Sequence, residues 1–176
     1  KAALVSPAVL VPFDRDRKTR VVTDYNGFSN TEGVVTRRPA VGASLWQLHD
    51  TVWKPVGYAS RFLSQAEENL VRREAAFSSS VGESIAFHFS LTYFFPELSC
   101  VGTFDALVDC KNLTWWRSSD STVMVNLRAS LSGRYDLSTI NLRHISRTRN
   151  FSDALARMTS IESLIPDANI MASTYS

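Results

Sequence analysis

Four acidic residues constrain this chain more than any other feature of its sequence. Asp24 and Asp109 each end a short apolar run of the kind that forms a buried strand. Glu83 opens an apolar helical stretch, and Asp153 stands in the first turn of a short expected helix. Carboxylates brought close together repel one another unless a hard divalent cation neutralises them. The pattern therefore predicts a two-metal site of the kind that serves phosphodiester chemistry.

Composition favours one folded domain without a membrane segment. With 176 residues, 44% of them hydrophobic, the chain is long enough to bury a sizeable core. No apolar run approaches the roughly 20 residues that a membrane-spanning helix needs. The formal net charge is only +2, so any nucleic-acid binding must come from local basic clusters. Cys100 and Cys110 lie in or beside the same expected strand, which favours reduced thiols and an intracellular protein.

The chain is expected to be part of a longer polypeptide, because it begins with Lys1 rather than Met. Residues 1–16 are interpreted as the end of an upstream domain and its connector. Residues 17–159 form the expected domain, and residues 160–176 a linker to whatever follows.

Hydrophobic periodicity predicts alternating strands and helices. Between the first two strands, the polar composition of residues 24–42 predicts a long mobile loop. Ser64 and Glu67 have the spacing of a helix-capping box, and Pro96 is expected to stop the following helix. The strands are predicted at 20–24, 42–48, 52–59, 101–109 and 136–145, and the later helices within 74–95, near 121–131 and at 151–158.

Six segments, in this order, carry a resemblance to a known family. They are Thr23–Asp24, Gly42–Gln47, Lys54–Ser64 with Ala66, Glu67 and Asn69, Val108–Leu113, Leu142–Ile145 with Asn150, and Asp153–Arg157. Together they resemble the ribonuclease H domain of gypsy-class LTR retrotransposon polyproteins. Residues 1–10 resemble the end of the reverse transcriptase thumb and its connection.

This resemblance implies an α/β fold of the ribonuclease H-like type. A five-stranded mixed sheet, its first three strands antiparallel, would be flanked by helices. The implied activity is that of a metal-dependent endoribonuclease that cleaves the RNA strand of RNA–DNA hybrids during retrotransposon reverse transcription. The implied partners are the hybrid, an upstream reverse transcriptase and a downstream integrase of the same polyprotein, with no membrane. The implied location is the cytoplasm, in a virus-like particle.

The resemblance also implies the active-site residues. Asp24, Glu83, Asp109 and Asp153 would bind two Mg²⁺ ions, or Mn²⁺ in their place. His144, carried on a flexible loop, would move a proton or help the product leave. A second group of residues is basic and would hold phosphates of the nucleic acid: Lys111, Arg143, Arg147 and Arg149.

Each role has an ordinary structural alternative. Asp24 and Asp109 could be polar strand ends that face water, and Asp153 a first-turn acid that complements the helix dipole. The spacing between Asn150 and Asp153 is one residue shorter than in the family. His144 could be an ordinary strand-end histidine, and the arginines of the 143–149 segment a solvated loop.

The third carboxylate has two candidates. The family usually carries two glutamates separated by one residue, and the second binds metal. Counting without gaps from the preceding motif places the first at Glu74 and the metal ligand at Ala76, so Glu74 is the reserve candidate. Counting back from Asp109 places the ligand at Glu83. An insertion of about seven residues, two helical turns, reconciles the two counts and keeps the same helix face, so Glu83 is preferred.

Departures from the family pattern favour a second hypothesis. Tyr25, Asn26 and Gly27 follow the first aspartate where the family has alanine and serine, and the first hairpin is longer. A bulky Tyr25 beside the carboxylates would crowd metal and substrate. The alternative is a repurposed, catalytically silent domain that acts as a structural or RNA-binding module in a larger host ribonucleoprotein assembly. Retention of all four acids favours the enzyme. A resolvase or transposase core of the same fold is the weaker third possibility.

Overall fold

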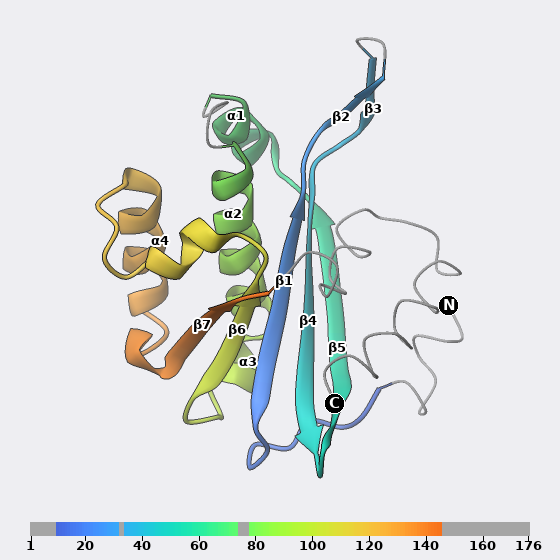
Figure 1. Ribbon diagram of the computed structural model, residues 1–176, viewed down its shortest axis with the longest axis vertical. Helices are drawn as coiled ribbons and strands as arrows, with labels where there is room; N and C mark the ends of the chain where they lie inside the picture. Colours follow the sequence, from blue (N-terminus) through green and yellow to red (C-terminus); the bar gives the residue numbers. More distant parts are fainter. Residues whose placement is uncertain (1–9, 32–33, 74–77, 146–176) are drawn as a thin grey trace.

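A five-stranded mixed sheet forms the centre of the molecule. The computed structural model describes residues 10–31, 34–73 and 78–145. The strands lie in the order β5-β4-β1-β6-β7, as Figure 1 shows. Their bounds are Thr19–Asn26 for β1, Ala40–His49 for β4, Val52–Phe62 for β5, Phe104–Val108 for β6 and Ile140–His144 for β7. β1, β4 and β5 pair antiparallel, whereas β6 pairs parallel with both β1 and β7. The predicted sheet, with its first three strands antiparallel, is confirmed.

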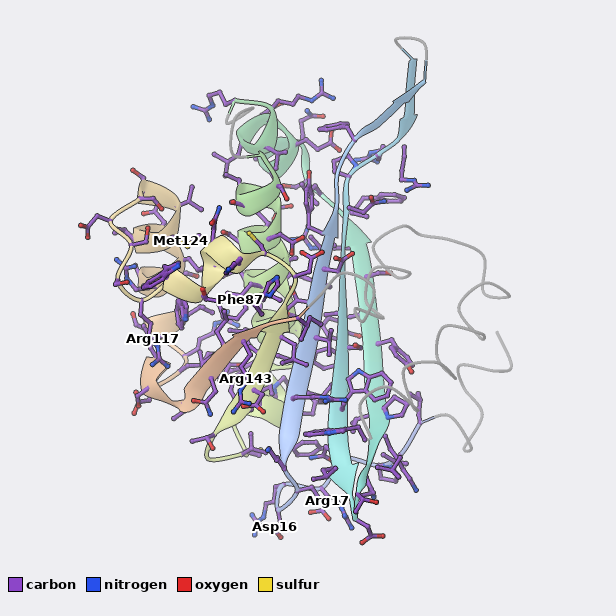
Figure 2. The ribbon with its side chains drawn as sticks, in the orientation of Figure 1. Asp16, Arg17, Phe87, Arg117, Met124 and Arg143 are labelled. Carbon is purple, nitrogen blue, oxygen red and sulfur yellow. The ribbon has the colours of Figure 1, made fainter. Side chains whose placement is uncertain are left out.

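Helices cover one face of this sheet. The described helical segments are α1 (Gln65–Arg73), α2 (Ser78–Tyr93), α3 (Phe95–Leu98) and α4 (Thr122–Ser132), with 3₁₀ turns η2 (Lys111–Trp115) and η3 (Leu137–Thr139). α2 runs along the sheet and α4 packs outside it (Figure 1). Phe87 of α2 and Met124 of α4 belong to the main core on this side, as Figure 2 shows. No helix of the described ranges is long and apolar enough to cross a membrane.

β1 is buried on both faces. Alternate residues of a strand point to opposite sides, so Val21 joins the core beneath the helices while Val22 joins a second cluster with Trp46 and Trp53. Both valines have no exposed surface. Asp24, near the end of this strand, is therefore shielded from water as well.

The predicted β4–β5 hairpin is confirmed. Its turn places Asp50 at a φ of 56°, in the left-handed region that aspartate tolerates better than most residues. β5 also contains Pro55, which lacks an N–H to donate to a ladder. The sheet accommodates Pro55 because β5 is an edge strand with a register shift opposite Leu45 and Trp46.

The prediction of a mobile loop between residues 24 and 42 is wrong. β1 continues to Asn26, β4 begins at Ala40, and between them β2 (Ser29–Thr31) and β3 (Val34–Arg37) pair as a separate two-stranded ribbon. The ribbon projects beyond the main sheet at the end where α1 lies (Figure 1). The β-branched sequence Val34-Val35-Thr36 favours this extended pairing, which the polar composition around it concealed.

The predicted capping box begins α1. The backbone N–H of Ser64 donates to the Glu67 carboxylate at 2.8 Å, and the N–H of Glu67 donates to the Ser64 hydroxyl at 3.3 Å. Arg61 also donates two hydrogen bonds to Glu67, at 2.7 and 2.8 Å. These contacts hold α1 against the end of β5.

Two element boundaries differ from the prediction. α2 ends at Tyr93, and Pro96 lies in the first turn of α3, where its missing N–H needs no partner. β7 begins at Ile140, because Asp136 instead accepts the Ser138 N–H and caps η3. Cys100 and Cys110 are free thiols. The predicted helix at 151–158 and the boundary at residue 159 lie outside the described residues.

Candidate metal centre

Three of the predicted acids come together at one end of the sheet. Asp24, Glu83 and Asp109 each place one carboxylate oxygen within 4.8 Å of the others. Asp24 lies near the end of β1 and Asp109 directly follows β6, so the parallel pairing of these strands brings the two residues to the same edge. Glu83 comes from the second turn of α2. The chain thus builds the cluster from three elements that the sheet and α2 hold in place.

Burial makes this cluster electrostatically costly. Asp24 is fully buried and Glu83 is 2% exposed. Burial raises the pKa of Glu83 well above its ordinary value, and the negative charges of Asp24 and Asp109, with a hydrogen bond to Asp109, raise that pKa further. Among the described residues, no lysine or arginine forms a salt bridge with Glu83. A positive charge from outside the protein would relieve the repulsion.

The donor set fits a hard divalent cation. Oε2 of Glu83 is buried and has no hydrogen-bond partner in the described part of the chain. A buried carboxylate oxygen without a partner is a destabilising arrangement for a protein alone, whereas it is a ready ligand for Mg²⁺ or Mn²⁺. Clustered carboxylate oxygens are the ligands these ions prefer. The structure thus supports a cation at this position on chemical grounds.

In the sequence, Tyr25 follows Asp24 and Gly82 precedes Glu83, and these two acids are the most buried members of the cluster. Tyr25 is 5% exposed and packs with Val41, Leu63 and Val81. Its ring occupies the space that a side chain at residue 82 would need. Burial, followed by the charges of Glu83 and Glu68, raises the pKa of Tyr25 to about 12, so its hydroxyl is neutral. Gly82 makes the room that the bulky Tyr25 requires.

His144 is placed differently from the prediction. It is the last residue of β7 rather than part of a flexible loop, because the register of β7 on β6 continues to the pair Val108–His144. The imidazole is exposed, and its Nε2 lies 3.1 Å from the backbone oxygen of Asp109. His144 therefore borders the carboxylate cluster through the main chain of one of its members.

Two of the predicted basic residues, Lys111 and Arg143, lie in the described part of the chain. Lys111 begins η2, two residues after Asp109, and is exposed. Arg143 is 63% exposed and forms an ion pair with Asp105 at 3.5 Å. Four further candidates lie outside the described residues: Glu74, Arg147, Arg149 and Asp153. The roles of all these residues in metal or phosphate binding stay predictions.

Gly82 is the site residue that the sequence reasoning missed. A lone glycine inside an apolar helical stretch usually marks a close approach of another group, and Gly82 directly precedes Glu83. That signal was present in the sequence. The contact between Ser80 Oγ and Cys110 Sγ, at 3.7 Å, also lies beside the acids, and no sequence pattern indicated it.

Comparison with known proteins supports the fold. No protein-family model matches the chain, and no curated protein matches it. Among solved structures, the foamy viral protease–reverse transcriptase in complex with dsDNA matches with a TM-score of 0.51 and 11% identity. The match covers 78% of this chain and only 25% of that one. The chain has a ribonuclease H-like fold. At this identity the likeness shows the fold alone, and it does not support the gypsy class in particular.

Two other solved structures match more weakly. The RNase H domain of prototype foamy virus, solved in solution, has a TM-score of 0.45 and 13% identity, over 91% of this chain and 92% of that one. The NurA nuclease from Sulfolobus solfataricus has a TM-score of 0.40 and 12% identity, over 91% and 62% of the two chains.

Proposed function

We propose that the chain is a metal-dependent endoribonuclease that cleaves the RNA strand of RNA–DNA hybrids. The observation that carries the proposal is the convergence of Asp24, Glu83 and Asp109 within 4.8 Å at one end of a ribonuclease H-like sheet. Packing alone does not account for three carboxylates so close together, two of them buried. Phosphodiester hydrolysis by bound divalent ions does account for them.

The protein's own contribution is to hold negative charge in a fixed place. β1, β6 and α2 position the three carboxylates before any ion binds, and Asp153 would complete the set. Two Mg²⁺ or Mn²⁺ ions, when bound, would supply the Lewis acidity that activates water and stabilises the leaving 3′ oxygen. The imidazole of His144 is exposed at the edge of the site and can both accept and donate a proton, so it is suited to take or return one there.

The proposed context is retroelement reverse transcription. The resemblance of the six sequence segments supports a gypsy-class polyprotein, with a reverse transcriptase upstream and an integrase downstream. The foamy viral relative in fold is itself a protease–reverse transcriptase bound to dsDNA, of which this chain matches a quarter. A nucleic-acid duplex is therefore the proposed partner, and a cytoplasmic virus-like particle the proposed location.

The test is cleavage of an RNA–DNA hybrid labelled on both strands. Wild-type protein, in Mg²⁺ and in Mn²⁺, is expected to cut the RNA strand and leave the DNA strand intact. Asp109→Asn should abolish cutting, while the matched control Asp120→Asn, an exposed aspartate outside the acidic cluster, should not. If folded wild-type protein is inert with excess hybrid, and stays inert when the proposed polymerase domain is added, a silent structural or RNA-binding module is the better account.

A further inference from the structure

The β2–β3 ribbon begins beside the carboxylate cluster. β1 ends at Asn26, two residues after Asp24, and Phe28 stands at the foot of the ribbon. At about 3.3 Å per residue, the four residues from Asp24 to Phe28 span at most roughly 13 Å. The ribbon and the C-terminal end of α1 both lie at this end of the molecule (Figure 1).

Aromatic rings hold two arginines at this position. The guanidinium carbon of Arg72, in the last turn of α1, lies 4.3 Å from the centre of the Phe28 ring. That of Arg38, which follows β3, lies 5.1 Å from the centre of the Phe62 ring. Phe62 is itself 45% exposed. Such ring contacts restrict a guanidinium group without using its N–H donors. Arg38 is held further, because its Nε and Nη2 donate to the Glu68 carboxylate and Nη2 also to the Leu63 backbone oxygen.

This surface also has an excess of positive charge. Arg37, Arg38, Arg72 and Arg73 are all exposed. Glu68, which is buried, pairs with Arg38 at 3.0 Å, and no carboxylate of the described ranges pairs with the other three arginines. Among the described residues of this surface, four arginines against the carboxylate of Glu68 give a local charge of +3.

We propose that these residues form an arginine platform that binds the sugar–phosphate backbone of the hybrid outside the cleavage site. The platform consists of Phe28, Arg37, Arg38, Phe62, Arg72 and Arg73. The proposal rests on the proposed function, since the hybrid is the substrate named there. A separation of up to roughly 13 Å corresponds to no more than about four nucleotides at 3.4 Å each along a strand. Arginine forks match phosphate oxygens, and aromatic rings can pack against sugars or exposed bases.

The experiment measures binding rather than cleavage. Wild-type protein and Arg37→Ala/Arg72→Ala are titrated against a fluorescent hybrid in EDTA over a range of salt concentrations. The matched control is Arg15→Ala/Arg134→Ala. Arg134 is also an exposed arginine over a ring, 5.7 Å from the centre of Phe95, and Phe95 follows the far end of α2. Arg15 adjoins Asp16, which lies at the opposite end of the sheet from the ribbon (Figure 2).

The platform variant should bind roughly tenfold more weakly, and its slope of log affinity against log salt should be shallower by about 1.8, or 0.9 for each lost phosphate contact. The control should keep the wild-type slope. Arg73→Ala alone should make the slope shallower by about 0.9, which provides a second measurement if the double variant folds poorly. An unchanged slope in both variants would overturn the proposal, and so would the absence of hybrid binding by the wild type.

These outcomes separate the platform from the nuclease. A reduced slope in a protein that never cuts RNA would support the platform and count against the nuclease. Normal RNA cleavage with an unchanged slope would support the nuclease and overturn the platform. An acidic protein as the true partner would likewise leave the slope for the hybrid unchanged.

Discussion

The ring of Tyr25 lies directly over the backbone of Gly82. A Cβ atom added to residue 82 would be 2.2 Å from Cε1 of that ring, a separation that real atoms do not reach. Tyr25 follows Asp24 in β1, and Gly82 precedes Glu83 in α2. The close approach of ring and glycine therefore determines how near β1 comes to α2 at the point where both carry a carboxylate of the proposed site.

Gly82→Ala should disturb both the fold and the site. Alanine would ordinarily stabilise a helix interior by about 1 kcal/mol relative to glycine. Here we expect a net loss of about 1–3 kcal/mol in unfolding free energy, because the ring must move. RNA cleavage should fall as the separation of Asp24 and Glu83 changes. Denaturant unfolding and the hybrid assay measure the two effects.

Gly133→Ala is the matched control for this prediction. Gly133 caps α4 with a φ of −73°, and nothing lies within 4 Å of a Cβ placed there. We expect no loss of stability or cleavage in this variant. Equal effects at both glycines would show that the contact with Tyr25 is unimportant.

Divalent metal should stabilise the protein through the acidic cluster. A ligand at 100 times its dissociation constant adds about 2.7 kcal/mol to the free energy of unfolding, so Mn²⁺ should raise the Tm of the wild type. Glu83→Gln should lose most of that increase. In EDTA the same variant should melt at a higher temperature than the wild type, since it removes one of three neighbouring carboxylates, whose ionised form burial and the other two acids disfavour.

The control for metal binding is Asp120→Asn, which removes an exposed charge outside the acidic cluster. Its Tm should rise with Mn²⁺ as much as that of the wild type. A Glu83→Gln protein that Mn²⁺ still stabilises in full would contradict the assignment of Glu83.

His144→Ala should slow RNA cleavage without weakening metal binding. The residue is exposed, and its imidazole contacts the backbone oxygen of Asp109, so the fold should tolerate the change. A proton-transfer role predicts a loss of at least about 100-fold in the cleavage rate and a changed pH profile. His88→Ala, at a histidine that contacts Ser130 at 2.8 Å, should leave the rate unchanged. A wild-type pH profile in His144→Ala would exclude the role.

The start of α1 should lose stability in acid. Burial alone would raise the pKa of Glu67, but hydrogen bonds from Arg61 and Ser64 outweigh it and lower that pKa below 4.5. A depressed carboxylate pKa adds stability above the unfolded-state pKa, and that stability is lost as the pH falls through the folded-state pKa.

Glu67→Gln tests this pH dependence. Glutamine keeps the capping acceptor and removes the charge, so we expect a loss of about 0.5–1 kcal/mol at neutral pH, a small value because Arg61 is 38% exposed. The difference between variant and wild type, followed by urea unfolding, should shrink below pH 4.5. A difference independent of pH would mean that the ion pair contributes nothing.

Local patterns predicted the elements that position the site. Asp24 and Asp109 end apolar runs that became adjacent parallel strands, and Ser64 with Glu67 formed the expected capping box. The strand ends and the capping box depend on spacing within short segments, which a sequence displays directly. Glu83 was chosen by counting back from Asp109 over the interval that the family resemblance implies, and the fold brings it to the other two acids.

Contacts between distant segments were not predictable in the same way. The ribbon appeared as a polar loop, since its pairing depends on a few β-branched residues. The stacking of Arg72 on Phe28 joins α1 to the foot of the ribbon, and no periodicity links two such positions. Tyr25 was recognised as bulky, but only the structure shows that Gly82 accommodates its ring.

The most direct test is single-turnover cleavage of a hybrid by the wild type, Glu83→Gln and Glu97→Gln in Mn²⁺. Glu97 lies in α3, beyond the far end of α2, so its substitution controls for the loss of one carboxylate. We predict that wild type and Glu97→Gln cut the RNA strand at equal rates and that Glu83→Gln does not cut. Equal rates for all three proteins would contradict the account.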